Sequence, residues 1–322
     1  MGAKIAQIEY YLPEKVLTNE ELTALNPGWS AAKIETKVGI RNRHIAASDE
    51  SSMDMAIKAA KKLLKYHAAD AMDFLIFCTQ SPEYLLPTSA CIIQDRLGLR
   101  TDVGAFDFNL GCSGYIYGLA MAKALIESRI ASNVLLLTGE TYSKFIIDSD
   151  ISNKSIFGDS ATATLVTYSE QEQIGEFVFG TNGAGAENLI VNNIGAKNYY
   201  TCPKGMSPEL YMDGPEIFNF TIETIPKLVQ DVCSKNKLGL SDVSYTILHQ
   251  ANKYILEFLT QTIGIEPDKV HIDLWEYGNT VSNTIPIALK DCLDRRIVKL
   301  QDRVLLAGFG VGYSWGAVVL NL

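Results

Sequence analysis

The stretch Ala105-Phe-Asp-Phe-Asn-Leu-Gly-Cys112-Ser-Gly-Tyr-Ile-Tyr-Gly-Leu-Ala-Met-Ala-Lys-Ala-Leu125 decides how this chain folds. It predicts a buried strand, a tight glycine turn, a cysteine and then a helix rich in small residues. A cysteine in the first turn of such a helix faces free backbone N–H groups and the positive end of the helix dipole, which favour the thiolate. The alternative is that Cys112 is a small, inert core residue, which is the commoner fate of a free cysteine.

Composition sets the class of protein. The chain has 322 residues, of which 47% are hydrophobic and 20% are charged, so it can bury a large core and form two domains. Its net charge is −9 and it has no run of Lys or Arg, which argues against a nucleic-acid partner. We expect a cytoplasmic protein without membrane contact, because there is neither a signal peptide nor an apolar stretch of ~20 residues.

Cysteine and histidine spacing indicates neither disulfides nor a metal site. The six cysteines are scattered at positions 78, 91, 112, 202, 233 and 292, and the four histidines at 44, 67, 249 and 271. No pair shows the close spacing of a zinc site, so we expect reduced thiols and no bound metal.

Predicted strands and helices alternate along the chain. Apolar runs at 74–78, 134–137, 161–167, 245–248, 270–274, 303–307 and 317–320 predict strands, and amphipathic segments between them predict helices. This alternation is typical of parallel sheets that helices cover on both faces.

The two halves of the chain resemble each other, which predicts a duplicated α/β domain. Three landmarks recur in the same order: 73–80 matches 244–250, 105–111 with its helix matches 271–278 with its helix, and 133–139 matches 303–308. We therefore divide the chain into residues 1–170, which carry Cys112, and residues 171–322.

Duplication places equivalent loops side by side. The turn at Asn279 occupies the place in the second half that Cys112 occupies in the first, and His249 follows a strand, where open sheets bind ligands. A thiolate beside imidazole and amide donors suits acyl transfer through a thioester, with an oxyanion or enolate held by hydrogen bonds. Taken singly, His249 could be a strand-end histidine satisfied by backbone, and Asn279 an ordinary turn residue.

The glycine-rich loop Gly308-Phe-Gly-Val-Gly-Tyr313 resembles half of a dinucleotide-binding fingerprint. It runs into a strand rather than a helix, so we reject that interpretation. A source of backbone N–H donors for an oxyanion is a better use of this loop.

With these residues in hand, the chain resembles the β-ketoacyl-acyl carrier protein synthase III branch of the thiolase superfamily nearly end to end. The resemblance rests on Gly39-Ile-Arg41, Arg43-His-Ile45, Gly111-Cys-Ser-Gly114, Phe157-Gly-Asp159, His249-Gln-Ala-Asn252, Tyr277-Gly-Asn-Thr280 and Gly308–Gly316. It implies a duplicated, five-layered αβαβα thiolase-like fold, a homodimer, and a catalytic triad of Cys112, His249 and Asn279. It also implies no cofactor, since the substrates carry phosphopantetheine as CoA or acyl carrier protein.

The family's chemistry assigns further residues. An acyl group passes from a thioester donor to Cys112, malonyl-acyl carrier protein loses CO2, and the carbanion attacks the acyl-enzyme. The N–H of Cys112 and one from Gly310, Val311 or Gly312 are expected to form the oxyanion hole. Leu86 and Phe309 are assigned to the acyl pocket, Leu86 from the partner subunit. Trp29, Lys37, Asn252 and Lys253 are assigned to the pantetheine path.

Three departures from the family pattern bear on the identity of the acyl donor. Lys37 stands where relatives that grip CoA have Arg, no Trp occupies residues 32–37, and Ile151 replaces a second Arg. Lys lacks the flat guanidinium that stacks on adenine, so both acyl-CoA and acyl carrier protein remain open as donors.

Two other functions remain open at this point. The first is transfer of the Cys112-bound acyl group to an alcohol or amine without decarboxylation. The second is a catalytically silent subunit that binds acyl chains, which an intact triad argues against.

Overall fold

Two mixed β-sheets form the framework of the computed structural model, which describes residues 2–24, 26, 28–192 and 209–322. The first sheet has the order β1 (Gly2–Tyr11), β7 (Ser160–Ser169), β6 (Asn133–Glu140), β4 (Phe74–Cys78) and β5 (Gly104–Phe108). The second has the order β8 (Ile174–Thr181), β13 (Ser314–Asn321), β12 (Arg303–Gly310) and β11 (Tyr245–Leu248).

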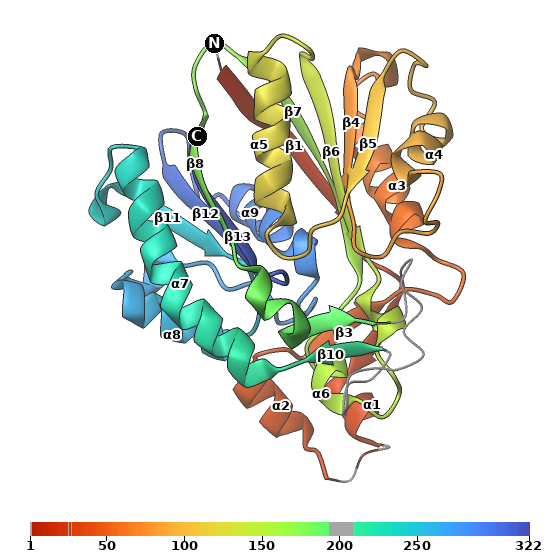
Figure 1. Ribbon diagram of the computed structural model, residues 1–322, viewed down its shortest axis with the longest axis vertical. Coiled ribbons are helices and arrows are strands. Elements are labelled where there is room, and N and C mark those ends of the chain that lie inside the picture. The colour runs from red at the N-terminus through yellow and green to blue at the C-terminus, as the bar shows by residue number, and fades with distance from the viewer. Residues whose placement is uncertain (1, 25, 27, 193–208) are drawn as a thin grey trace.

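Helices make three layers around these sheets (Figure 1). Helices α5 (Gly114–Glu127) and α9 (Thr284–Asp294) lie between the sheets and share one apolar core with both of them. Helices α3 (Ser52–Leu63) and α4 (Ser89–Arg96) cover the outer face of the first sheet, and α7 (Gly214–Lys235) and α8 (Lys253–Ile263) cover that of the second. The five-layered αβαβα prediction is confirmed.

The remaining elements are short. They are β2 (Lys15–Thr18), β3 (Asn42–Ile45), β9 (Leu189–Val191), β10 (Leu210–Met212), α1 (Asn19–Ala24), α2 (Ala31–Val38), α6 (Ile151–Lys154) and six 3₁₀ turns, among them η6 (Val281–Asn283). Several of them close the end of the molecule at which the strands carrying the candidate site finish (Figure 1).

The two sheets repeat one another strand for strand. In each, an antiparallel trio (β1-β7-β6 and β8-β13-β12) continues into a parallel strand (β4 and β11). Strand β5 then pairs in parallel with β4, and a single parallel bridge from Thr246 to Val270 takes its place in the second sheet. All strands of the first sheet lie within residues 2–169 and all of the second within 174–321, while the exact division at residue 170 stays a prediction.

Three details differ from the sequence-based expectation. The sheets are mixed rather than parallel, because β1 and β7, like β8 and β13, run antiparallel to their neighbours; alternation of elements does not encode strand direction. The expected strand at 270–274 is reduced to one bridge, and the strand β8 was not predicted.

Side-chain caps fix several helix starts. Ser51 and Asp54 form a capping box at the start of α3, with Asp54 N donating to Ser51 Oγ and Ser51 N to Asp54 Oδ2. Asn252 caps α8 by accepting from the N–H of Ile255, which fixes the loop that follows His249. Among the described helices, none is both long and apolar enough to cross a membrane.

Candidate active site

Cys112 lies on the turn that joins β5 to α5. The N–H of Gly114 donates to the Gly111 carbonyl over 2.8 Å, and α5 begins at Gly114, two residues after Cys112 rather than at it. Ser113 Oγ lies 2.6 Å from Ser314 Oγ of β13, which joins the turn to the second half. A Cβ on Gly308 would come within 2.7 Å of the Cys112 carbonyl oxygen, so the backbone of β12 passes directly against the turn.

His249 follows the last residue of β11 and is 2% exposed. Its backbone N–H donates to Ala307 O over 2.8 Å, which extends the β11–β12 pairing by one residue. Its Nδ1 lies 2.8 Å from the hydroxyl of Thr284, the first residue of α9. The ring therefore presents Nε2 to the site.

Asn279 is held by a turn from the other half of the chain. Its N–H donates to Ile156 O over 2.8 Å and its carbonyl accepts from Gly158 N over 3.1 Å, so the Phe157-Gly-Asp159 motif of the first half positions it. Its Oδ1 accepts from Val281 N over 2.9 Å, and Val281 adopts φ +58°, which is strained for a β-branched residue. Asn279 Nδ2 thereby points toward His249 Nε2, 3.5 Å away.

The three predicted catalytic residues meet at one cavity of about 180 Å³. Cys112, His249 and Asn279 are 6%, 2% and 5% exposed, so little of each reaches solvent. The rest of the lining is mostly apolar and comes from both halves: Tyr142, Ile156, Phe157, Leu189, Met212, Ile217, Ile255, Phe309 and Gly310 are among it. The structure brings Cys112, His249 and Asn279 together, as the duplication predicted.

Burial dominates the ionisation of the site. Burial and then the nearby Glu140 raise the pKa of the Cys112 thiol to about 12, and the backbone N–H groups of Cys112 and Val311 oppose this. Burial lowers the pKa of His249 to about 3, so its imidazole is neutral at physiological pH. The sequence-based expectation of a thiolate is therefore wrong for the free protein, because desolvation outweighs the N–H groups around the sulfur.

Glu140 is the residue that sequence reasoning missed. It ends β6, is fully buried, and accepts from Gln80 N with both carboxylate oxygens at 3.1 Å. Ser81 Oγ donates to it over 3.1 Å and Ser282 Oγ, from the turn after Asn279, over 3.4 Å. Burial raises the pKa of Glu140 to about 8. An acidic residue at the end of an apolar strand was the available signal.

One geometric observation bears on the predicted oxyanion hole. A Cβ on Gly310 would lie 3.0 Å from both Cβ and Sγ of Cys112, so only glycine lets the loop approach the sulfur this closely. Val311 N–H faces the same sulfur, whereas Gly312, at φ +138°, lies beyond the cavity lining.

Residues expected along the pantetheine path are divided between two hollows. Asn252 lines both the Cys112 cavity and a more open surface hollow that also contains Lys37 and Tyr254. Lys253 lies 3.6 Å from Glu257 and over the ring of Trp275. Trp29 is 44% exposed and lines neither hollow.

The two residues assigned to the acyl pocket lie in different places. Phe309 lines the cavity, with its ring edge-on to His249 at 5.7 Å between centroids. Leu86 is 83% exposed and is absent from the cavity of its own chain. It could reach an acyl group only in a second copy.

The segment 39–45, which contains Arg41, Arg43 and His44, has a structural role. Arg43 is fully buried, and its guanidinium donates to Asn19 Oδ1 over 2.8 Å and to Ser155 O over 2.9 Å. His44 Nδ1 lies 2.6 Å from Pro13 O. These contacts hold the segment whose carbonyl at His44 accepts from Asp159 N, in the motif that positions Asn279.

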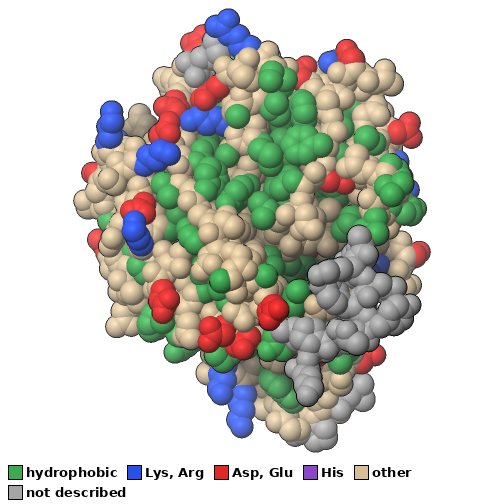
Figure 2. Space-filling model, in the orientation of Figure 1, with side chains coloured by type: hydrophobic (Ala, Val, Ile, Leu, Met, Phe, Trp, Pro, Cys, Tyr) green, Lys and Arg blue, Asp and Glu red, His purple; other side chains and the backbone are tan. Residues whose placement is uncertain are grey.

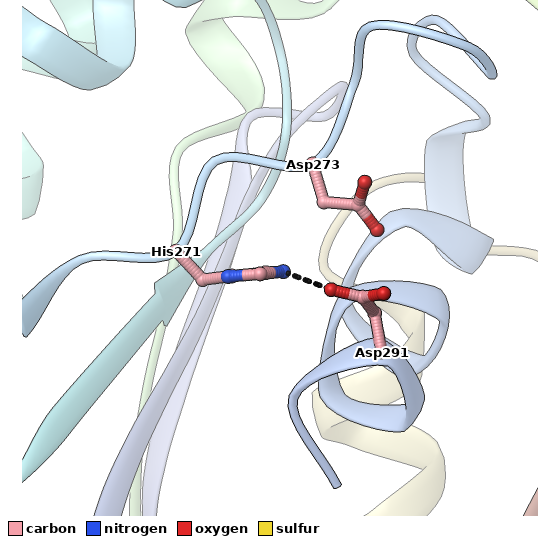
Figure 3. A group of neighbouring side chains, drawn as sticks. All are labelled: His271, Asp273 and Asp291. Carbon is pink, nitrogen blue, oxygen red and sulfur yellow. Dashed lines mark ion pairs between the residues drawn. The ribbon is translucent and has the colours of Figure 1, made fainter. Parts of the chain in front are cut away.

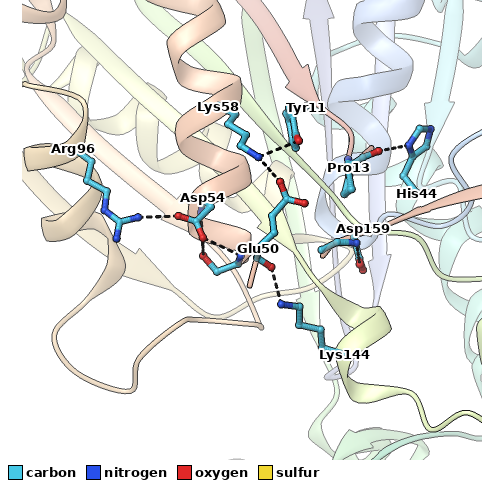
Figure 4. A network of polar contacts seen from close by, with 11 residues as sticks. Tyr11, Pro13, His44, Glu50, Asp54, Lys58, Arg96, Lys144 and Asp159 are labelled. Carbon is cyan, nitrogen blue, oxygen red and sulfur yellow. Dashed lines mark hydrogen bonds and ion pairs between the residues drawn. The ribbon is translucent and has the colours of Figure 1, made fainter. Parts of the chain in front are cut away.

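A larger, open surface hollow of about 950 Å³ lies elsewhere on the first half. It shares no lining residue with the Cys112 cavity, and ion pairs cross it: Lys58 with Glu50 at 2.5 Å and Arg96 with Asp54 at 2.8 Å (Figure 4). Its polar, solvent-exposed pairs suit a surface groove rather than a reaction site.

Comparison with known proteins identifies the architecture. A family model described as 3-oxoacyl-[acyl-carrier-protein (ACP)] synthase III matches residues 106–183, and the model of its C-terminal region matches residues 233–322. A curated relative from Streptococcus pneumoniae (strain Hungary19A-6), a beta-ketoacyl-[acyl-carrier-protein] synthase III, is 33% identical over 327 residues and 99% of each chain is covered. The chain belongs to the 3-oxoacyl-acyl carrier protein synthase III family.

Solved structures of this family superpose closely on the chain. A crystal structure of a 3-oxoacyl-(acyl-carrier-protein) synthase III has a TM-score of 0.96 and 43% identity, with 100% of both chains covered. The corresponding synthase from Burkholderia xenovorans LB400 gives 0.95 and 36%, covering 100% of this chain and 94% of that one. As a synthase III family member, the chain is a thiolase-like acyltransferase.

Proposed function

We propose that this chain condenses an acyl thioester with malonyl-acyl carrier protein through an acyl-Cys112 intermediate. Its synthase III membership gives the reaction, and the observation that supports the residue roles is the meeting of Cys112, His249 and Asn279 at one buried, largely apolar cavity. Condensation is the activity of this family, so it takes precedence over simple transfer to an alcohol or amine.

In the first half-reaction, the Cys112 sulfur attacks the thioester carbonyl and the carrier thiol leaves. The raised pKa of Cys112 keeps the proton on the sulfur until substrate arrives, and the proton then passes through Nε2 of the neutral His249 imidazole to the departing carrier sulfur, which leaves as a thiol. The backbone N–H groups of Cys112 and Val311 hold the developing oxyanion. Gly310 makes room for it, because a Cβ at residue 310 would lie 3.0 Å from the sulfur.

In the second half-reaction, the bond between the malonyl α-carbon and its carboxylate breaks and CO2 leaves. The electron pair moves into the thioester carbonyl, and the enolate oxygen accepts hydrogen bonds from Asn279 Nδ2 and from His249 Nε2–H, once the ring proton has moved to Nε2 and Nδ1 accepts from the Thr284 hydroxyl. The α-carbon then attacks the acyl-Cys112 carbonyl and the Cys112 sulfur leaves. A proton from water restores the thiol, and the product is a 3-oxoacyl thioester. Two neutral donors suit this step, since a carboxylate would repel the enolate.

The pantetheine arm enters past Asn252. This residue lines both the inner cavity and the outer hollow, so a linear chain that reaches Cys112 passes it. Lys37, at the outer hollow, is placed to meet a phosphate, a group that CoA and acyl carrier protein share. Lys253 is engaged by Glu257 and Trp275, which makes it the weaker phosphate partner.

We also propose that the chain works as a homodimer. Strand β5 is the edge of the first sheet, all five of its residues are half-buried, and Phe106 and Phe108 are among them. Apolar side chains gather on the face over which α5 lies (Figure 2). Phe179, whose ring packs against Tyr117 of α5, is 42% exposed. Pairing of two β5 edges would bury this surface, and the exposed Leu86 of one copy could then reach the Cys112 cavity of the other.

Three assays test these proposals. Intact-mass spectrometry after incubation with acyl-CoA or acyl-acyl carrier protein should show an adduct on Cys112, and the better donor identifies the source of the acyl group. Malonyl-acyl carrier protein should then release CO2 and yield a 3-oxoacyl product. An adduct that passes to alcohols or amines without CO2 release would favour simple transfer. A monomer by analytical ultracentrifugation would remove the role of Leu86.

A further inference from the structure

One buried amide links the turn that carries Asn279 to the first half of the molecule. Asn283 ends the 3₁₀ turn η6, lies directly before α9 and is fully buried. Its Nδ2 donates to Ser160 O of β7 and to Thr280 O, each over 3.0 Å. Its Oδ1 accepts from the hydroxyl of Thr138 on β6. Both N–H groups and the oxygen of this side chain are therefore engaged, which fixes how the amide is turned.

The hydrogen bonds behind Asn283 run in one direction. Thr138 Oγ1 lies 2.6 Å from the hydroxyl of Thr162, its partner across the β6–β7 pair. Because a carbonyl oxygen only accepts, the single hydroxyl proton of Thr138 goes to Asn283, and Thr162 donates to Thr138. Loss of the Thr138 hydroxyl would leave Asn283 Oδ1 buried without a donor. Two neighbouring strands of the first half therefore hold one side chain of the second.

Asn283 also holds the peptide group that orients Asn279. The carbonyl of Thr280 accepts from Asn283 N over 3.1 Å and from Asn283 Nδ2 over 3.0 Å. The N–H at the other end of the same peptide group, that of Val281, donates to Asn279 Oδ1 over 2.9 Å. Asn279 Nδ2 is thereby directed toward His249. A rotation of this peptide group would pass directly to the Asn279 amide.

The turn needs such a restraint because its backbone is strained. Val281 adopts φ +58°, a conformation that a β-branched residue keeps only where the surrounding contacts hold it. The neighbouring contact between the halves, from Ser282 Oγ to Glu140, is long at 3.4 Å. The shorter hydrogen bonds of Asn283 therefore restrain the turn more tightly than Ser282 does.

The alternative is that Asn283 only anchors the start of α9. That helix has a separate anchor in its own half, since Asp291 Oδ2 lies 3.0 Å from His271 Nε2, with Asp273 beside them (Figure 3). The two roles differ in what they predict. An anchor for α9 affects the stability of the whole fold, whereas a restraint on the Asn279 turn affects one step of the reaction.

We propose that Asn283 is a positioning residue for Asn279, and that Thr138 holds Asn283 in place. The inference rests on the function proposed above, in which Asn279 donates a hydrogen bond to the enolate. It follows that loss of the Thr138 hydroxyl slows the release of CO2 and spares formation of acyl-Cys112, because a separate turn holds Cys112. Thr138 does not line the Cys112 cavity, so its effect passes through Asn283.

Thr138→Val and Thr138→Ser in the full-length protein test the inference. The first replaces the hydroxyl by a methyl group, and the second keeps the hydroxyl. Thr138→Val should lower kcat for CO2 release from malonyl-acyl carrier protein by roughly tenfold to a hundredfold, the upper value being the cost of a misplacement of about 1 Å. KM for that substrate and the rate of acyl-Cys112 formation should not change, since a transition-state contact is lost. Thr138→Ser should restore kcat.

Thr164→Val is the matched control. Thr164 is a fully buried threonine of β7, and its hydroxyl lies 3.3 Å from Tyr115 OH, so its loss also removes a buried polar contact. It should lower Tm without changing the ratio of the two rates. Asn283→Ala should lower kcat at least as much as Thr138→Val. The double variant should lose no more than Asn283→Ala alone, because both changes act through one amide.

The outcomes separate this inference from the proposed function. CO2 release by Thr138→Val at the wild-type rate, or additive losses in the double variant, would overturn the positioning role. Equal falls in CO2 release and acyl-Cys112 formation would show that Thr138 contributes stability alone. A wild-type protein that forms acyl-Cys112 but releases no CO2 would overturn the proposed function, and this inference with it. If Thr138→Val does not fold by circular dichroism, Asn283→Ala decides through the same two rates.

Discussion

The first and second halves of this molecule share a strand order and differ at one place that matters. In the first half, β5 is a full strand, and the turn after it carries Cys112. In the second half, the equivalent segment pairs through one bridge at Val270 and continues as a loop to Asn279. The first copy thus supplies a nucleophile on a regular strand-turn-helix unit, and the second supplies hydrogen-bond donors on a loop.

This difference shows how a duplicated scaffold can divide a reaction between its copies. The first half holds the Asn279 loop of the second half through hydrogen bonds from Asn279 to Ile156 and Gly158. These contacts keep the loop in place although Val281 adopts a strained, positive φ. Glu140 of the first half also reaches Ser282 of the second. The two chemical steps should therefore be separable by substitution in one half or the other.

The largest effect should follow removal of the nucleophile. Cys112→Ala should lower turnover by roughly a thousandfold or more, because no acyl-enzyme can form. Intact-mass spectrometry with an acyl thioester should show no adduct. Cys91→Ala is the control, since Cys91 is an exposed cysteine of the same half and its loss should leave the adduct unchanged. An adduct in the Cys112→Ala protein would assign the acyl group to another residue.

Substitution of Asn279 in the second half should spare the first step, which forms the acyl-Cys112 intermediate. Asn279→Asp should lower CO2 release from malonyl-acyl carrier protein by roughly 10²–10³-fold, because a carboxylate replaces an enolate donor. The Cys112 adduct should still form at a similar rate. Equal loss of both steps would mean that the two halves do not divide the reaction as their geometry indicates.

The residue that joins the halves should alter pH dependence. Glu140 has a pKa of about 8, so its negative charge appears above that pH and opposes thiolate formation at Cys112. In Glu140→Gln no charge appears, so iodoacetamide should alkylate Cys112 faster than in the wild type above pH 8. The ratio should approach tenfold if the charge raises the pKa of the thiol by about one unit, and it should fall toward one at pH 6.5.

Two other acidic groups near Glu140 bear on this experiment. Cys78 is buried with its Sγ 3.0 Å from Leu110 O, and burial holds its pKa well above the usual range. Burial raises the pKa of Asp159 to about 6, so it titrates below the range tested. A rate ratio that does not change between pH 6.5 and 9 would show that Glu140→Gln acts by repacking alone. His249, with a pKa of about 3, should contribute no inflection there.

The smallest effect should come from the residue behind the imidazole. Thr284→Val removes the hydroxyl at His249 Nδ1, and CO2 release should fall roughly tenfold, the value of one hydrogen bond of about 1.4 kcal/mol. Thr284→Ser should restore it. Thr260→Val removes a buried hydroxyl from α8 in the same half and serves as the control. If both Thr→Val variants lose activity equally, Thr284 contributes packing only.

Local patterns predicted the elements well where they encode one outcome. Apolar runs such as 74–78 and 245–248 appear as strands with those bounds. The segment that follows the second of them forms the helix α8, as the alternation of elements predicts. Strand direction, the bridge at Val270 and the strand β8 were missed, because they depend on which neighbour a segment meets rather than on its own sequence.

The candidate site was likewise predicted only in part from the sequence. Cys112, His249 and Asn279 were found by sequence, since the duplication predicts that equivalent loops converge. The ionisation of Cys112 was not, because it depends on burial and on Glu140, which arrives from a third strand. Cys202 lies outside the described residues, and Leu86 as an acyl-pocket residue stays a prediction.

By itself, the sequence indicated a duplicated α/β chain from its patterning. Its short motifs indicated the family, and through that resemblance the five-layered fold and the proposed nucleophile, because patterning and motifs are local properties. Only the tertiary structure decided that the Cys112 thiol is protonated at rest, that Phe157-Gly-Asp159 positions Asn279, and that His271, Asp273 and Asp291 share one space. These features depend on desolvation and on contacts between segments more than a hundred residues apart or on separate elements. Cys112 is therefore the nucleophile that the sequence proposes, and its surroundings keep it a thiol at rest.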